Sequence, residues 1–343
     1  MGKGVTYRTV LRSIMLVVGI LLSYNLTGSK SRGESILFVP SPNIFNVNDN
    51  SRFELYFSSP WLYHTNPESS KLLDSYTAIT SGDWNTPSTW GGVVPTVNDD
   101  VTIPTGVTIT VNTPSFCNNI VINGTLSITG NNRLQVNGNW ENYGTFTPGT
   151  NGTIEFAGSS NISINGNTNF EELIINKGNL NNTITINGTS TITSGGSLAF
   201  NSGRIIIPPA GSFSINPSNG ITIPALAGIE VTGGTLNTGH FTITNEGLIR
   251  ISSGTAIFGT NSGNSVHTQG KGAFIVNGGS VNIAGRLESS AAGILNPPNV
   301  PSGISISDGT VTLCTVGNGL NNTGSLNITS NGDFSFTGGT IIF

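Results

Sequence analysis

One short sequence phrase recurs through the last two thirds of the chain and constrains the fold more than any other feature. It is a glycine, then serine or threonine, then an apolar residue, any residue, and usually another apolar residue. It begins at Gly124, Gly152, Gly196, Gly211, Gly254, Gly279, Gly309, Gly324 and Gly339. Alternating apolar positions are typical of a half-buried strand, and glycine permits a sharp turn before it. Gaps of about 15 to 45 residues favour one or two strands per coil, with loops of varying length.

We therefore predict an all-β chain that folds as a right-handed parallel β-helix, or β-solenoid. The alternative is a string of sandwich domains, which would need Greek-key strand sets of about 100 residues separated by linkers. No change in composition marks a linker between Thr77 and Phe343. The strongest breaks are Pro208-Pro209 and Asn296-Pro297-Pro298, which we interpret as loops that project from the coils.

Composition supports a folded chain and limits its partners. The 46 glycines would suggest disorder if apolar residues were scarce, but 36% of the residues are hydrophobic. From Thr77 onward the chain holds six Lys and Arg against twelve Asp and Glu, which gives this region a net charge of −6. A basic footprint for nucleic acid is therefore absent, and anionic membranes are poor partners on bulk charge.

The two cysteines are expected to be free. Cys117 and Cys314 lie 197 residues apart. With about 22 residues per coil and a spacing of about 4.8 Å between coils, they would lie roughly 40 Å apart. A disulfide needs Cα atoms within about 7 Å, so we expect both thiols to be mostly buried as small apolar groups.

The N-terminal part of the chain divides into a leader and a cap. Residues 1–29 combine a basic start with the short apolar run Ile14–Leu22, which is typical of a secretory signal peptide with an uncertain cleavage site. The run is too short to span a membrane, so no span is expected after cleavage. Because a solenoid exposes a sheet edge at each end, we interpret residues 30–76 as an N-terminal cap and residues 77–343 as the solenoid.

The solenoid is predicted to begin in the segment 81–112. Val101–Ile103 and Val107–Val111 alternate branched apolar residues with threonine, and Pro104-Thr105-Gly106 forms the turn between them. Trp84 and Trp90 are too large to leave fully exposed. Asp99 and Asp100, which follow Asn98, have short side chains that can accept hydrogen bonds from turn amides.

The residues of this segment resemble a known family. The order is W…P-S-T-W-G-G…V-P-T…D-D-V-T-I-P…G-V-T-I, and its motif residues are Trp84, Trp90, Pro95, Asp99, Asp100 and Gly106. Over residues 81–125 this order is similar to the G8 domain and its relatives, which open the β-helical regions of large secreted surface proteins of the Bacteroidetes. The resemblance implies an extracellular, adhesin-like or carbohydrate-associated role, and it supplies no catalytic residues.

No catalytic, cofactor or metal site is predicted from the residues. The acids after the first coil are scattered, and no two of them recur at coil spacing with a basic partner. The three histidines are too few and too separated for a metal cluster. Asp99 and Asp100 are weak candidates for Ca²⁺, but capping of a turn is the preferred interpretation.

The sequence leaves three functions open. The first is an exported cell-surface or secreted structural, adhesive β-helix whose loops bind a glycan or a protein surface. The second is a β-helical carbohydrate-active enzyme, either a polysaccharide lyase or a hydrolase. The third is a spacer that carries a downstream domain. The apolar strand that runs to Phe343 is an edge for a possible strand partner, or the solenoid continues beyond it in a longer product.

Overall fold

The computed structural model describes residues 74–217, 220–316, 325–329 and 331–343. The signal peptide and almost all of the predicted cap lie outside the described residues. The first described strand, β1 (Ser75–Thr77), already pairs in parallel with β3 (Asp100–Ile103). The solenoid ladder therefore begins slightly before Thr77.

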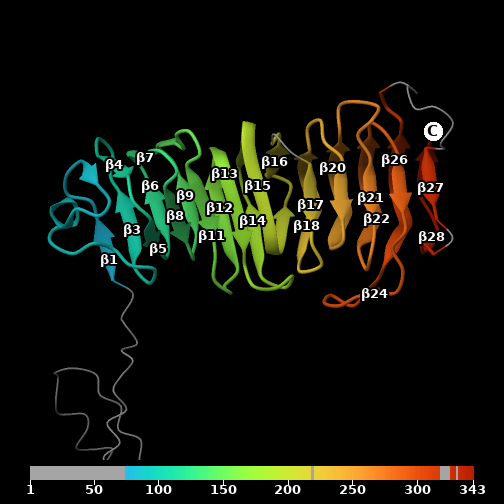
Figure 1. Ribbon diagram of the computed structural model, residues 1–343, viewed down its shortest axis with the longest axis horizontal. Coiled ribbons are helices and arrows are strands. Elements are labelled where there is room, and N and C mark those ends of the chain that lie inside the picture. The colour runs from blue at the N-terminus through green and yellow to red at the C-terminus, as the bar shows by residue number, and fades with distance from the viewer. Residues whose placement is uncertain (1–73, 218–219, 317–324, 330) are drawn as a thin grey trace, which may run out of the picture. The chain divides into compact units, whose positions relative to one another are not determined.

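The chain is a parallel β-solenoid with three sides, which it visits in a constant order. Figure 1 shows the strands stacked side by side along the long axis of the solenoid, from β1 to β28. Side 1 consists of β1, β3, β6 (Ile120–Ile122), β9 (Trp140–Asn142), β12 (Ile162–Gly166), β14 (Thr183–Ile186), the end of β15 (Thr189–Ile207), the first halves of β18 (Ala227–Asn237), β20 (Leu248–Phe258), β22 (Ala273–Ile283) and β26 (Gly303–Leu313), and β28 (Phe334–Phe336).

The other two sides are built from the strands between these. Side 2 consists of β2 (Gly82–Asp83), β4 (Thr108–Val111), β7 (Thr125–Ile128), β10 (Thr145–Thr147), the starts of β13 (Thr168–Asn176) and β15, β16 (Ser212–Ile215), the second halves of β18, β20, β22 and β26, and β29 (Thr340–Ile342). Side 3 consists of β5 (Ser115–Cys117), β8 (Arg133–Val136), β11 (Thr153–Phe156), the end of β13, the middle of β15, β17 (Ile221–Ile223), β19 (Ile243–Asn245), β21 (Val266–Thr268), β23 (Leu287–Ser289) and β27 (Leu326–Ile328).

The pairing register confirms the predicted solenoid and excludes the sandwich alternative. Every strand pairing on the three sides is parallel, whereas Greek-key sandwiches are antiparallel. The turn from Val101 to its partner Ile120 is short, and the turn from Leu287 to its partner Leu326 is about twice as long. The right-handed sense of the coil stays a prediction.

The core is a set of apolar columns that run along the axis. Ile229, Ile249, Phe274 and Ile304 occupy one register position on successive strands of side 1, and each is at most 1% exposed. Full burial of such a side chain stabilises the fold by about 1.5–3 kcal/mol. Because like residues stack in register, the columns bury apolar area without a globular core.

Glycines make the sharp corner between sides 1 and 2. Gly254, Gly279, Gly309 and Gly339 all have positive φ, from +72° at Gly279 to +83° at Gly339. A Cβ built on Gly279 would lie 2.6 Å from the carbonyl oxygen of Gly254 in the preceding coil. The glycine of the repeated phrase is therefore needed at these corners both for its backbone conformation and for close stacking of coils.

One of the two proline loops projects and the other does not. Asn296-Pro297-Pro298 lies in the connection of the antiparallel hairpin formed by β24 (Ile294–Leu295) and β25 (Val300–Pro301), as predicted. Pro208-Pro209 instead forms a tight corner turn between β15 and β16, in which the Gly211 N–H donates to the Pro208 carbonyl at 2.7 Å. The prediction of a projecting loop there was wrong.

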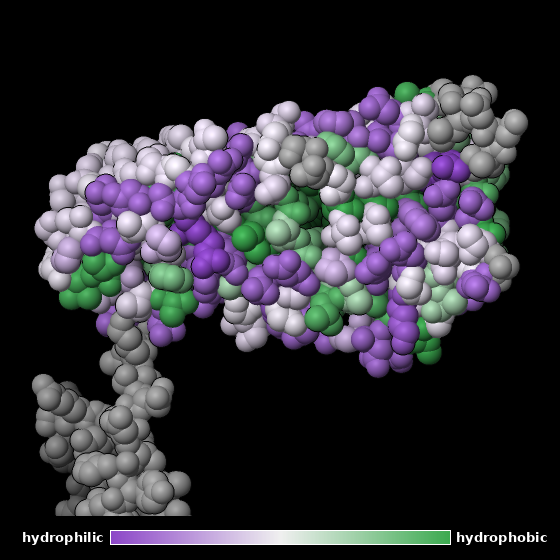
Figure 2. Space-filling model, viewed as in Figure 1, coloured by the Kyte–Doolittle hydropathy of each residue, from purple (hydrophilic) through white to green (hydrophobic). Residues whose placement is uncertain are grey.

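The hairpin takes part in a second apolar cluster, outside the core. Its Leu295 packs with Leu180, Leu248 and Ala273, all at most 2% exposed. Leu180 comes from the turn before β14, and a Cβ on Gly228 would lie only 2.9 Å from it. Figure 2 shows apolar surface gathered over the middle of the solenoid, flanked by polar residues.

Both cysteines are free, as predicted. Cys117 is fully buried, and burial raises the pKa of its thiol, with the charge of Asp100 adding to the effect. Cys314 is only partly buried. In the part of the chain that the structure describes, no helix has the length and apolar character needed to cross a membrane.

Candidate functional site

The motif residues of the first coil form a packed and hydrogen-bonded structural unit. Trp84 is fully buried and Trp90 is 4% exposed, and their rings meet edge to face with centroids 5.1 Å apart. The Trp90 indole N–H donates to the Trp84 carbonyl at 2.6 Å. Pro95 is also buried, whereas Gly106 occupies an exposed turn at φ +84°. These residues hold the first coil together and leave little surface for a ligand.

The two acids of this segment accept hydrogen bonds from protein donors. Asp99 Oδ2 accepts from the backbone N–H of Thr96 at 2.8 Å and from its hydroxyl at 2.6 Å. Asp100 Oδ1 accepts from the side chain of Asn118 at 2.8 Å and from both the backbone and side chain of Asn119. This is the turn-capping role preferred from the sequence. Among the described residues, no group of three or more acidic, histidine or cysteine side chains is placed to hold a metal ion.

Ion pairs between coils were not predicted from the sequence. On the outer surface of side 1, Glu230 lies between Arg204 and Arg250, with N–O distances of 3.5 and 3.6 Å. On side 3, Arg133 contacts Glu155 at 2.7 Å. These ion pairs could not be recognised in the sequence because the turns differ in length, so the partners are not separated by one fixed number of residues.

A polar surface built by the register lies on the outside of side 3, over β19, β21, β23 and β27. We call it the polar array. Inward residues of these strands, such as Ile243, Val266 and Leu287, are buried, and the residues that alternate with them face outward. The polar array comprises Thr242, Thr244, Glu246, Ser265, His267, Gln269, Arg286, Glu288, Ser290, Ser325 and Asn327.

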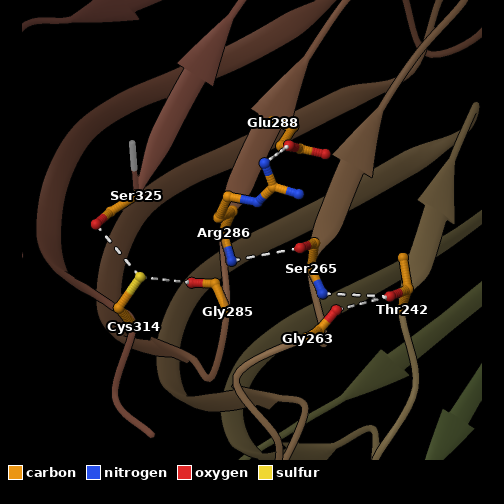
Figure 3. A network of polar contacts seen from close by, with 8 residues as sticks. All are labelled: Thr242, Gly263, Ser265, Gly285, Arg286, Glu288, Cys314 and Ser325. Carbon is orange, nitrogen blue, oxygen red and sulfur yellow. Dashed lines mark hydrogen bonds and ion pairs between the residues drawn. The ribbon is translucent and has the colours of Figure 1, made fainter. Parts of the chain in front are cut away.

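One column of the polar array is tied together from coil to coil (Figure 3). The Ser265 N–H donates to Thr242 Oγ1 at 3.3 Å, and the Arg286 N–H donates to Ser265 Oγ at 3.4 Å. Cys314 Sγ lies 3.3 Å from Ser325 Oγ and 3.4 Å from the Gly285 carbonyl, at the downstream end of this column. These contacts fix the edge of the polar array to the backbone.

The charged members make contacts that hold their side chains in place. Arg286 Nη1 lies 3.1 Å from Glu288 Oε1, with the two side chains 23% and 18% exposed. On the opposite edge, Gln269 Nε2 donates to Glu246 Oε1 at 2.8 Å. A tethered side chain loses less rotamer freedom when a ligand binds.

The geometry of the polar array follows from its strands. Adjacent strands are about 4.8 Å apart, and outward residues on one strand are about 6.6 Å apart. The result is a flat grid of hydroxyl, amide, carboxylate, imidazole and guanidinium groups, which together donate and accept hydrogen bonds. Such a grid is suited to an extended ligand that is rich in hydroxyl groups.

Sequence reasoning missed the polar array, although one of its four strands carried a signal. The last of the four segments carries the repeated phrase that begins at Gly324, which was recognised only as the strand period. The other three each have one apolar residue followed by two polar residues, at Ile243–Asn245, Val266–Thr268 and Leu287–Ser289. The register was not visible, because the turn from Leu287 to its partner Leu326 is almost twice as long as the turn from Val266 to its partner Leu287. Without the register the polar residues could not be assigned to one surface.

Comparisons with known proteins give one finding. Searches of the curated proteins and of the solved structures found no match. The polar array lies downstream of the region that does match a family. Residues 89–199, which begin within the first coil and extend well past the segment 81–125, are similar to the G8 domain.

Proposed function

We propose that the protein is an exported, cell-surface or secreted, structural and adhesive β-helix that binds a glycan through the polar array. The observation that carries the proposal is the in-register polar grid on four successive strands. Most of its side chains are at least partly exposed, and several are tethered by neighbours, so hydrogen-bonding groups are presented in fixed positions. The signal-like residues 1–29 and the similarity to the G8 domain support an extracellular setting.

The ligand class follows from the chemistry of the grid. Neutral sugars present hydroxyl groups that both donate and accept, as do the threonine, serine, asparagine and glutamine side chains of the polar array. The acidic balance of the solenoid disfavours polyanions. We therefore expect a neutral, extended polysaccharide that lies across several strands. Membrane and nucleic-acid partners are not part of the proposal.

A matched pair of double variants tests this function. Thr244→Ala with Asn327→Ala removes two polar side chains of the array, whereas Asn282→Ala with Thr312→Ala removes the same chemistry from the outer surface of side 2. Each lost hydrogen bond is worth about 1 kcal/mol, so the array variant should bind an immobilised neutral glycan about 30-fold more weakly. The side 2 variant should bind like the parent protein.

Two outcomes would count against the proposal. One is absence of binding to every neutral glycan on a glycan microarray, which would favour a spacer role. The other is equal loss of binding in both double variants. New reducing ends or unsaturated products after incubation with polysaccharides would favour the carbohydrate-active enzyme.

A further inference from the structure

One contact in the polar array brings together a hydroxyl and an imidazole. Ser290 Oγ lies 3.3 Å from Nε2 of His267, and both side chains are partly exposed. The two residues come from adjacent turns, because Thr268 is the register partner of Ser289. With Nε2 as the acceptor, the imidazole is placed to remove the hydroxyl proton, which is the arrangement that nucleophilic catalysis by serine requires.

A carboxylate lies beside this imidazole. Glu288 is the register partner of His267 on the next strand, and both side chains leave the same face of the sheet. Arg286 holds the Glu288 carboxylate at 3.1 Å. From this neighbouring strand the Glu288 carboxylate can orient the imidazole, which is the part that the acid plays beside a serine nucleophile and its histidine base. Glu288 is thus a positioning residue for His267.

A side-chain amide comes from the turn next to Ser290. Gln269 follows Thr268 as Ser290 follows Ser289, so the two residues are neighbours on adjacent turns. This neighbour relation is supported by the Ser290 N–H, which donates to the Thr268 carbonyl at 2.9 Å. Gln269 Nε2 uses one hydrogen for Glu246, and an amide nitrogen carries two. The second can be donated to an oxyanion that forms at Ser290.

The backbone next to Ser290 is held rigidly. The β24–β25 hairpin begins shortly after it, and the base of the hairpin is fixed by the Gly293 N–H, which donates to Asp333 Oδ2 at 2.9 Å. The Ser302 hydroxyl donates to the Lys271 carbonyl at 2.8 Å on the other strand of the base. A rigid scaffold keeps a nucleophile and its base in a productive geometry.

We propose that Ser290, His267 and Glu288 form a serine esterase site that removes O-acyl groups from a glycan. Ser290 Oγ bonds to the acyl carbon while its proton passes to His267 Nε2. The ester C–O bond then breaks, and His267 returns the proton to the departing sugar oxygen, which leaves as a hydroxyl group. Water hydrolyses the acyl-serine in the same way and releases a carboxylic acid. Only the choice of a glycan as the alcohol rests on the proposed function.

The test uses probes that do not depend on glycan binding. The intact protein is treated with a fluorophosphonate, and the modified residue is located by peptide mass analysis. Hydrolysis of 4-nitrophenyl acetate and release of acetate from acetylated xylan are measured in parallel. We expect labelling of Ser290, and loss of at least about 100-fold in kcat/KM in Ser290→Ala and His267→Gln. Ser305→Ala, on the outer surface of side 1, is the control.

The role of Glu288 has its own readout. Glu288→Gln should lower kcat by about 10-fold or more and shift the acidic limb of the pH–rate profile, whereas a purely structural residue would change stability without moving that limb. Absence of labelling at Ser290 in the folded protein, or hydrolysis that persists in Ser290→Ala, would overturn the proposal. The proposal that the polar array binds a glycan would not be affected by that result, because its own double variants test it separately.

Discussion

The glycine corners provide a quantitative test of how coils stack. Substitution of Gly279 by alanine places a Cβ 2.6 Å from the carbonyl oxygen of Gly254 and 2.9 Å from the carbonyl carbon of Ser253, in a residue with φ +72°. The left-handed conformation costs an alanine about 1–2 kcal/mol, and forced overpacking costs about 1–3 kcal/mol more. We expect Gly279→Ala to lower the free energy of unfolding by about 3 kcal/mol.

Two neighbouring glycines separate the contributions. Gly270 has φ +60° with no atom within 4 Å of a built Cβ, so Gly270→Ala should lose only the conformational part, about 1 kcal/mol. Gly263 has open space as well and no positive φ, so Gly263→Ala should be neutral or stabilising by up to about 1 kcal/mol. Urea unfolding followed by circular dichroism measures all three. Equal losses in Gly279→Ala and Gly270→Ala would refute the argument that coil contact sets the corner residue.

Other side chains give four further predictions. Burial lowers the pKa of Lys177 from 10.5 to about 8. Between these two pH values the unfolded chain binds more protons than the folded chain, so the free energy of unfolding should rise with pH. Urea titrations at several pH values should show that Lys177→Met loses this rise. In the native protein, a thiol reagent should modify the partly exposed Cys314 well before Cys117, and intact mass should show two reduced cysteines. Glu230→Gln leaves two arginines without a shared carboxylate and should cost about 1 kcal/mol in urea unfolding, with a larger loss at low salt. Trp84→Ala should cost about 3–5 kcal/mol by the same measurement, because it removes a fully buried indole from the first coil.

Local patterns were enough to predict the fold because a solenoid repeats short-range features. Alternation marked the strands and glycine marked the corners, so neither required knowledge of distant contacts. The same was true of the hydrogen-bonded acids at Asp99 and Asp100, which act on a turn a few residues away or on the next coil.

The candidate site could not be predicted in the same way. Its residues meet only through the register of side 3, and the register depends on loop lengths that the sequence pattern does not fix. His267 was dismissed as isolated because its partner Ser290 belongs to the next turn of the solenoid. The hydrogen bond between them exists because Ser290 lies two positions along the strand from Glu288, the register partner of His267.

The direction of stacking also governs how the solenoid responds to tension. If the two ends of the solenoid are pulled apart, the hydrogen bonds between successive coils lie along the direction of the force. The coil at each end bears the load first, so coils should unfold one at a time. The turn from Val101 to Ile120 would release about 65 Å of chain, and the turn from Leu287 to Leu326 would release about 130 Å. The cluster of Leu180, Leu248, Ala273 and Leu295 joins several turns of the solenoid to the β24–β25 hairpin, so this region should unfold as a single larger step. A tether with these properties would lengthen in stages under load, and most of its strands would stay folded.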